Sequence, residues 1–284
     1  MALCMALQKI NRRLAFKSDF ERQCLRWRSF FVILYIYSGQ EDRQMKRMRL
    51  DRFFSSQEIL SRKEVRSAIK QKRITVNGSP AQKVDMSIDA EVDIICLDGR
   101  AIHYEPFIYL MLNKPQGVVS ATEDRSHMTV LDLVPPDLFR SDLFPAGRLD
   151  KDTTGFVLLT NDGDFSHHIL APDTHIEKRY EVIVDGTLST EEENLIRKGV
   201  TLADGYTCRP CGLMLINAGQ TPSYEVILHE GKYHQIKRMF GTVGKGVLAL
   251  KRTQIGGLVL DPSLPEGACR KIMHKEIDLI LCNS

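Results

Sequence analysis

The sequence predicts an α+β fold, with a small domain followed by a larger one. A chain of 284 residues is long enough for a large domain and a small accessory one. Apolar runs typical of strands outnumber amphipathic segments typical of helices, which leaves too few helices between strands for a doubly wound parallel sheet. Regular periodicity is lost between Asp98 and Pro106. We therefore place a domain junction near residues 100–106, dividing residues 48–104 from residues 105–284.

Residues 1–47 form a basic segment before the first predicted domain. Residues 1–48 carry ten Lys and Arg against four Asp and Glu, whereas the rest of the chain carries 29 against 32. The apolar run from Phe30 to Tyr37 is far shorter than the roughly 20 residues of a membrane-spanning helix, and no small-residue cleavage site follows it. We expect residues 1–47 to be disordered, or upstream sequence before a natural start at Met48. A short targeting or membrane-surface role is the alternative.

Two helices and three strands are predicted in residues 48–104. The first helix covers Arg49 to Ser55, and the second runs from Arg62 to about Gln71. Ser61 and Glu64 have the spacing of a capping box at the start of the second helix. The strands lie at residues 74–76, from the Asn77-Gly78 turn to about residue 84, and at residues 92–96.

The second of these helices has a basic side. Arg62, Arg66 and Lys70 recur every four residues, away from an apolar face. Six of the twelve residues from Arg62 to Arg73 are basic, although residues 49–284 carry a net negative charge. Such a cluster predicts contact with the phosphate groups of a nucleic acid. The alternative is an ordinary solvated helix face.

Residues 105–284 are predicted to contain four strands and two helices. The strands lie at residues 107–112, 156–160, 180–184 and 223–228. Thr190 and Glu193 predict a capping box for a helix that ends near Lys198. The second helix covers residues 233–243, and its apolar side includes Ile236 and Phe240.

Asp150 is a candidate catalytic carboxylate. Such a group needs shelter from bulk water, a cation to keep it ionised and a fixed approach to its substrate. Asp150 lies between the turns at Gly147 and at Thr153-Thr154-Gly155, and the apolar strand that follows can hold it rigidly. A single aspartate in such a loop would ordinarily cap backbone amides. Its neighbours elsewhere in the chain must therefore decide its role.

Two other uses of acidic residues fit the sequence poorly. A glycosidase would pair Asp150 with Asp152, but alternate residues of an extended segment point to opposite faces. A calcium site at Asp162 and Asp164 would lack the twelve-residue spacing of an EF-hand, so a turn is expected at Asn161-Asp162-Gly163.

The cysteines and histidines do not predict a metal site. Seven scattered cysteines give no disulfide framework, which indicates a reducing cytoplasm. Cys208 and Cys211 form a single CxxC pair without a second pair of ligands, and His167, His168 and His234 lack a zinc-binding spacing. We expect a zinc ion at none of these positions.

Five segments together resemble one enzyme family. The string Gly-Arg-Leu-Asp-Lys-Asp-Thr-Thr-Gly-Phe-Val-Leu-Leu-Thr-Asn-Asp-Gly at residues 147–163 closely resembles the catalytic motif of the rRNA pseudouridine synthases. Residues 113–117, 177–180 and 230–239 agree in the same order. Residues 48–95 resemble an S4 domain, a small RNA-binding module. Over residues 48–275 the chain is similar to the small-subunit (16S), RsuA-type branch of this family.

The resemblance implies a fold and a set of site residues. It implies an S4-like RNA-binding domain followed by a synthase domain with a large mixed, mainly antiparallel sheet flanked by helices. Asp150 matches the nucleophile and Tyr180 the tyrosine that stacks on the target base and assists proton transfer. Lys237 matches the basic partner of the aspartate, with Arg238 as the alternative. The implied RNA contacts are Arg148, Lys178, Arg62, Lys63, Arg66 and Lys70.

The resemblance also implies a reaction and a partner. The enzyme would isomerise a uridine of 16S rRNA, uridine 516 at the family's site, in free RNA or a small-subunit assembly intermediate. Isomerisation involves neither redox change nor hydrolysis, so no cofactor and no metal are expected. We expect a cytoplasmic monomer without membrane association. Open alternatives are a 23S rRNA target, a non-enzymatic S4-type RNA-binding factor, and attack of Asp150 on either uracil or ribose.

Overall fold

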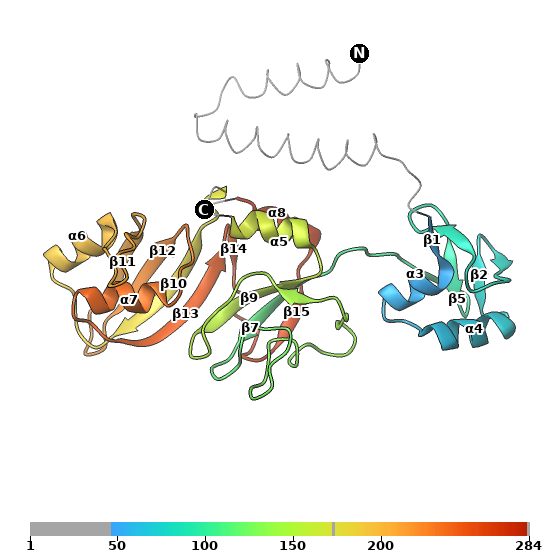
Figure 1. The fold of residues 1–284 in the computed structure, drawn as a ribbon, viewed down its shortest axis with the longest axis horizontal. Helices are drawn as coiled ribbons and strands as arrows, with labels where there is room; N and C mark the ends of the chain where they lie inside the picture. Colours follow the sequence, from blue (N-terminus) through green and yellow to red (C-terminus); the bar gives the residue numbers. More distant parts are fainter. Residues whose placement is uncertain (1–46, 172–173, 283–284) are drawn as a thin grey trace, which may run out of the picture. The chain divides into compact units, whose positions relative to one another are not determined.

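The computed structural model describes residues 47–171 and 174–282. The chain divides into two compact units, with the boundary between Tyr104 and Glu105 (Figure 1). The expectation for residues 1–47 lies outside the described residues, apart from Arg47. Within the described ranges, no helix is both long and apolar enough to cross a membrane.

The first unit combines two helices with two small sheets. Its four-stranded antiparallel sheet has the order β3-β2-β5-β6, and β1 pairs with β4 separately. The elements are β1 (Arg47–Arg49), α3 (Leu50–Ser56), α4 (Arg62–Lys70), β2 (Ile74–Val76), β3 (Ser79–Pro80), β4 (Ser87–Asp89), β5 (Ile95–Leu97) and β6 (Arg100–Ile102). Phe53, Phe54 and Val65 from the two helices are buried against Ile74 and Ile95 of the sheet.

The predicted helix α4 is confirmed, including its capping box. The Ser61 hydroxyl accepts from the Glu64 N–H, and the Glu64 carboxylate accepts from the Ser61 N–H. The strand predicted at residues 92–96 begins only at Ile95, because the Ile94 N–H is bonded to the Asn77 side chain within the turn. The strand predicted to reach residue 84 ends at Pro80.

The second unit is built on one nine-stranded sheet. The main order is β11-β12-β10-β13-β9-β7-β15 (Figure 1), with β14 paired to β13 and β8 paired to β9. Among the pairings of these nine strands in the described residues, only β9 with β13 is parallel, so the sheet is mixed and mainly antiparallel. The strands are β7 (Tyr109–Lys114), β8 (Phe144–Pro145), β9 (Thr154–Thr160), β10 (Lys178–Val184), β11 (Gly212–Asn217), β12 (Ser223–Leu228), β13 (Val247–Ile255), β14 (Leu258–Val259) and β15 (Cys269–Lys271). The helices are α5 (Gly163–Leu170), α6 (Thr190–Lys198), α7 (Gln235–Thr242) and α8 (His274–Ile280).

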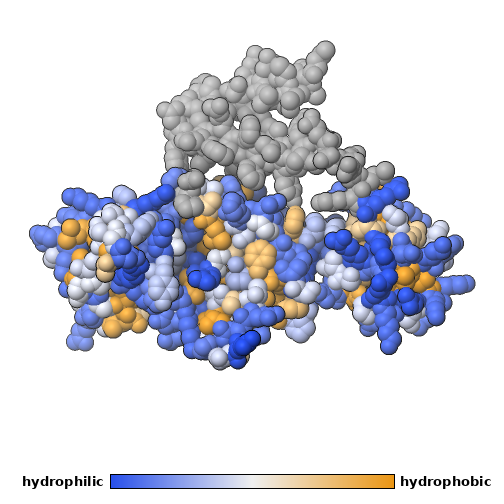
Figure 2. Space-filling view, viewed as in Figure 1, coloured by the Kyte–Doolittle hydropathy of each residue, from blue (hydrophilic) through white to orange (hydrophobic). Residues whose placement is uncertain are grey.

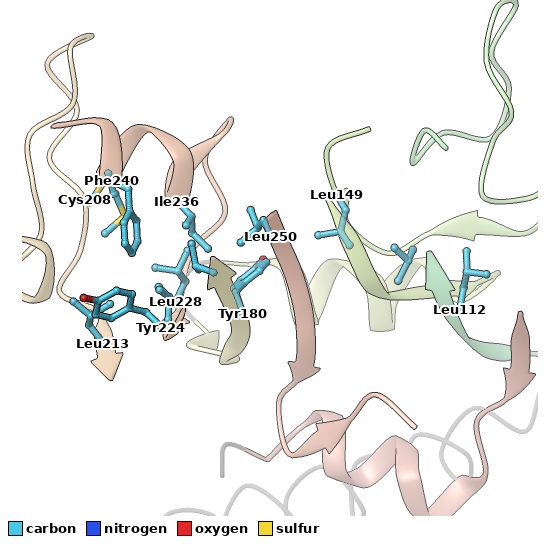
Figure 3. Close-up of a cluster of buried hydrophobic side chains, with 14 of the residues drawn as sticks. Leu112, Leu149, Tyr180, Cys208, Leu213, Tyr224, Leu228, Ile236, Phe240 and Leu250 are labelled. Carbon is cyan, nitrogen blue, oxygen red and sulfur yellow. The ribbon is translucent and has the colours of Figure 1, made fainter. Parts of the chain in front are cut away.

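Side chains that alternate along the central strands form two cores. On β9, Val157 and Leu159 belong to one apolar cluster, which also contains Phe240 of α7. Phe156 and Leu158 belong to the other, together with residues of α5 and α8. Figure 3 shows part of the first cluster, where Tyr180 of β10 lies near Leu228, Ile236 and Leu250. The helices therefore cover both faces of the sheet.

Several elements of the second unit differ from the sequence predictions. The turn expected at Asn161-Asp162-Gly163 opens helix α5 instead, because the Asp162 carboxylate accepts from the Phe165 N–H as an N-cap. The capping box of α6 is formed by Ser189 and Glu192, one residue earlier than predicted. Helix α7 begins at Gln235, two residues later than predicted. The nine-residue strand β13 was not predicted.

Candidate active site

Asp150 lies in the loop that joins β8 to β9, and this loop is held by hydrogen bonds. The Ser120 hydroxyl accepts from the Leu149 N–H and donates to the Leu149 carbonyl, each at 3.0 Å. The Thr153 N–H donates to the Asp150 carbonyl at 3.1 Å and closes the turn that follows. These bonds fix the backbone on both sides of the Asp150 carboxylate.

Lys114 supports the same loop from inside the protein. Its fully buried ammonium donates to the carbonyls of Thr153 (2.7 Å), Pro115 (3.1 Å) and Lys151 (3.2 Å). Burial lowers the pKa of Lys114 to about 8, although the Asp152 and Asp150 carboxylates oppose the shift. Residues 113–117 are one of the segments that resemble the family, but the sequence assigned no function to Lys114. Its burial depends on β7 continuing to residue 114.

Two basic side chains of the segment that opens α7 face the Asp150 carboxylate. Lys237 Nζ lies 3.7 Å from Asp150 Oδ2, and His234 Nε2 lies 3.5 Å from Asp150 Oδ1. Lys237 also lies 2.5 Å from Asp152 Oδ1, which makes Asp152 its nearer partner. The hydrogen bond from Lys237 holds the pKa of Asp152 below its usual range. The sequence did not indicate a role for His234.

Two sequence interpretations are corrected by this arrangement. Asp150 and Asp152 were expected on opposite faces of an extended segment. Residues 151 and 152 instead form a turn, so both carboxylates approach the same ammonium group. Arg238 was the alternative partner of Asp150, but its guanidinium pairs with Asp204 at 2.6 Å. Lys237 is therefore the member of this adjacent pair that contacts Asp150.

Tyr180 and Asp150 share a hollow, called here the Tyr180 hollow. The side chain of Tyr180 is 8% exposed. The polar and aromatic residues that line the hollow are Arg148, Asp150, Thr153, Tyr180, Glu230, Lys232, His234 and Gln235. The Thr153 hydroxyl is buried and has no hydrogen-bond partner within the described part of the chain. A carboxylate, an aromatic ring and an unsatisfied hydroxyl thus line one small space.

A second and wider hollow adjoins the first, and it is called here the Asp152 hollow. It has a volume of about 360 Å³ and is lined by Gln116, Gly117, Asp150, Lys151, Asp152 and His234. Asp150 and His234 line both hollows. The candidate carboxylate is therefore accessible from two adjoining spaces.

The buried carboxylate of Glu230 fixes the segment that leads into α7. It accepts hydrogen bonds from the Tyr206 hydroxyl (2.5 Å), the Gln235 side chain (2.6 Å) and the Arg209 N–H (3.0 Å). The Gln235 side-chain oxygen in turn accepts from the Lys232 N–H at 2.9 Å. Because Gln235 lies between His234 and Lys237 in sequence, this network positions both basic groups beside Asp150.

Comparison with known proteins agrees with this geometry. Residues 108–242 match the RNA pseudouridylate synthase family, and residues 48–94 match the S4 domain family. The chain is 38% identical over 233 residues to the ribosomal small subunit pseudouridine synthase A of Escherichia coli, a match that covers 81% of this chain and 98% of that protein. It is 42% identical over 235 residues to an RNA pseudouridine synthase of Bacillus subtilis, covering 82% of this chain and 98% of the relative.

The chain belongs to the RNA pseudouridine synthase family. A crystal structure of a pseudouridylate synthase is 35% identical, covers 82% of this chain and 99% of its own, and superposes with a TM-score of 0.58. The predictions of an S4 domain, a synthase domain and a mixed, mainly antiparallel sheet are thus confirmed. This pseudouridine synthase is an isomerase, as the sequence predicted.

Two basic residues near the site of this pseudouridine synthase differ in exposure. Arg148 is exposed at the Tyr180 hollow, where it can meet RNA. Lys178 was also expected to contact RNA, but its ammonium is buried and donates to the carbonyls of Ile176 (3.1 Å) and Ile169 (3.4 Å). Burial, with a contribution from the Arg252 cation, lowers the pKa of Lys178 to about 8. The prediction for Lys178 was wrong, because its position on β10 is internal.

The S4 domain of the pseudouridine synthase presents its predicted cations on α4. Arg62, Lys63, Arg66 and Lys70 are all exposed, while Val65 and Ala68 of the same helix face the core. Arg62 differs from the others because its Nε lies 2.9 Å from the buried carboxylate of Asp51.

The possible metal ligands and two of the cysteines are further candidate functional groups in the described residues. No group of three or more His, Cys, Asp or Glu side chains there is arranged to hold a metal ion. Burial raises the pKa of Cys211 to about 11 and also raises the pKa of Cys208. Both cysteines are therefore thiols rather than thiolates near neutral pH.

Proposed function

We propose that this pseudouridine synthase converts one uridine of 16S rRNA, uridine 516 in the numbering of the family's site, to pseudouridine. The observation that supports it best is the Asp150 carboxylate between Lys237 and His234, at the edge of a hollow lined by the Tyr180 ring. The relatives named for the small subunit, from Escherichia coli and Yersinia pestis, support 16S rRNA as the substrate.

The reaction exchanges one bond to the ribose for another. The bond between uracil N1 and ribose C1′ breaks, and a bond between uracil C5 and C1′ forms. C5 loses a proton and N1 gains one, so the product is an isomer of the substrate. In this proposal Asp150 is the nucleophile, and the Lys237 ammonium, 3.7 Å away, orients its carboxylate. The balance requires neither an oxidant nor a cofactor.

The target uridine must leave its helical stack before Asp150 can reach it. Enzymes that act on a base extrude it into a pocket and hold it against aromatic side chains. Tyr180 provides the ring for this purpose in the Tyr180 hollow, and Arg148 is an exposed cation at the same hollow. The buried Thr153 hydroxyl, which lacks a partner in the described structure, can bond to a polar atom of the flipped nucleotide.

The S4 domain, residues 48–104, provides RNA affinity in this proposal, and residues 105–284 provide catalysis. The exposed cations Lys63, Arg66 and Lys70 on α4 support phosphate binding. The substrate is an early small-subunit assembly particle, in which the uridine is still accessible for extrusion. The enzyme acts as a monomer in the cytoplasm.

The competing substrate is 23S rRNA, and mapping of pseudouridine in a deletion strain distinguishes the two. Carbodiimide treatment followed by reverse transcription locates pseudouridines in both ribosomal RNAs. We expect the deletion to remove one small-subunit site, and we expect the full-length gene to restore it. Loss of a large-subunit site with the small-subunit site intact would refute 16S rRNA as substrate. Unchanged maps of both RNAs would refute the activity on ribosomal RNA.

A further inference from the structure

Tyr233 is a strongly exposed aromatic residue beside the active site. Its side chain is 71% exposed, and its ring stacks on the His234 imidazole with centroids 3.8 Å apart and an angle of 18° between the planes. One face of the Tyr233 ring is thus covered by His234, and the exposure lies on the rest of the side chain. In the view of Figure 2, apolar side chains form small groups between hydrophilic ones. Tyr233 belongs to none of the apolar core clusters that the described residues form.

The stacked pair is held in place by its backbone. His234 has left-handed dihedral angles, φ 49° and ψ 35°, immediately before α7 begins. The Tyr233 carbonyl accepts a hydrogen bond from Arg238 at 3.3 Å, and Gln235 is bonded to the buried carboxylate of Glu230. A left-handed residue persists where its surroundings over-determine it, and such residues cluster at functional sites.

The Tyr233–His234 pair lies where an RNA substrate would approach Asp150. His234 lines both the Tyr180 hollow and the Asp152 hollow, and its Nε2 lies 3.5 Å from Asp150. A nucleotide extruded toward Asp150 remains bonded to its two neighbours in the strand, which must pass close to His234. Two exposed cations line these hollows, Lys151 the Asp152 hollow and Lys232 the Tyr180 hollow. Aromatic faces combined with nearby cations are how proteins hold unpaired nucleotides.

We propose that the Tyr233–His234 pair is a stacking platform for the unpaired base adjoining the target uridine in the same RNA strand. The inference rests on the proposed function, because it requires an RNA substrate extruded toward Asp150. The flanking base stacks on the outer face of the Tyr233 ring, while His234 supports the inner face. The platform thereby selects targets whose neighbouring base is free to leave its own stack.

A double-mutant cycle, in which the protein and the RNA are changed singly and together, tests the platform. The RNA is an rRNA fragment in which the wild-type enzyme forms pseudouridine, prepared with an abasic nucleotide on the 5′ or the 3′ side of the target. Binding is measured by fluorescence anisotropy in an Asp150→Asn background, so that the target stays uridine. The variants are Tyr233→Ala, Tyr233→Phe, and Met214→Ala as an exposed apolar control on β11.

Stacking predicts a specific pattern in this cycle. Tyr233→Ala weakens binding by about 5- to 100-fold, whereas Tyr233→Phe stays within about twofold of its parent because the ring is kept. Met214→Ala binds like its parent. One of the two abasic RNAs binds to the Asp150→Asn parent more weakly than the intact RNA does. The loss is similar in factor to that caused by Tyr233→Ala. The same abasic RNA does not weaken binding to Tyr233→Ala any further, because the stacking contact is already lost in that variant.

Three results would overturn the platform. One is a Tyr233→Ala variant that binds as tightly as its Asp150→Asn parent, and another is a Tyr233→Phe variant as weak as Tyr233→Ala. The third is additive losses at both abasic positions, which is the outcome if Tyr233 only maintains the local structure. Failure of the proposed function is recognised separately, because the wild-type enzyme would then form no pseudouridine in any 16S rRNA fragment.

Discussion

The Lys237 ammonium lies 2.5 Å from Asp152 Oδ1, closer than its 3.7 Å distance to Asp150 Oδ2. Lys237, which the sequence resemblance predicted as the partner of Asp150, is therefore shared between two carboxylates. Asp152 is 59% exposed and Asp150 only 27%. The more exposed carboxylate thus makes the shorter contact with the ammonium, and the more sheltered carboxylate makes the longer one.

This sharing predicts unequal effects for two substitutions. Lys237→Met lowers kcat/KM by at least about 100-fold, because it removes the cation that faces Asp150. Asp152→Asn lowers kcat/KM by less than about fivefold, because a pair with an exposed partner contributes little and Lys237 can move to Asp150. Initial rates of pseudouridine formation compare the two variants. A loss in Asp152→Asn as large as that in Lys237→Met would contradict this ranking.

Burial of Lys178 predicts a dependence of stability on pH. Its pKa is about 8 in the folded protein, below the ordinary lysine value of 10.5, so the unfolded chain binds more protons between these two pH values. The free energy of unfolding therefore rises with pH from about 8 to 10.5, by up to roughly 3 kcal/mol from this group. Urea denaturation of the wild type and Lys178→Met across this range isolates the contribution. Parallel pH profiles for the two proteins would show that Lys178 is not a buried cation.

The cations of α4 predict the salt dependence of RNA binding. Replacing Arg66 and Lys70 with Gln weakens RNA binding. It also makes the negative slope of log K against log salt shallower, by about 0.7 to 0.9 for each phosphate that the variant no longer neutralises. Arg62→Gln also weakens binding, but it additionally removes a partner of the buried Asp51 carboxylate and so lowers stability. Lys83→Gln, an exposed cation outside α4, is the matched control. An unchanged slope in the Arg66 and Lys70 variants would exclude α4 from the RNA interface.

Gly155 is required for the parallel pairing of β9 with β13. Its φ is +98°, and a Cβ at this position would lie 2.3 Å from the backbone oxygen of Arg252. Gly155→Ala must therefore displace β13, and we expect a lowered Tm and loss of activity. Gly163→Ala is the control, because its Cβ would meet nothing within 4 Å at the start of α5. Equal Tm values for the two variants would contradict the close packing at Gly155.

Local patterns in the sequence predicted the elements that local interactions determine. The capping box of Ser61 and Glu64 and the strand at residues 223–228 depend on neighbouring residues and were found where expected. Strand β13 was missed because Lys251 and Arg252 interrupt its apolar pattern, and Arg252 is buried only through pairing with distant strands. Its Nε donates to the Phe156 carbonyl, a contact that sequence periodicity cannot indicate.

The sequence predicted which residues belong to the candidate site better than it predicted their ion-pair partners. Lys237 and Arg238 are adjacent cations, and their different partners depend on Asp204, far away in the chain. The burial of Lys178 did have a local indication, because alternation along β10 places it on the same side as the buried Tyr180. No local pattern indicated the position of His234, because its left-handed backbone depends on the tertiary network around Glu230.

The central claim is that the Asp150 carboxylate performs the chemistry, and Asp150→Asn tests it most directly. The amide keeps the size of the side chain but removes the nucleophilic charge. Pseudouridine formation and RNA affinity are measured on the same rRNA fragment, with the wild-type enzyme in parallel. We expect no detectable pseudouridine from Asp150→Asn and an affinity within about threefold of the wild type. Pseudouridine formation by Asp150→Asn at a rate near that of the wild type would contradict the assignment.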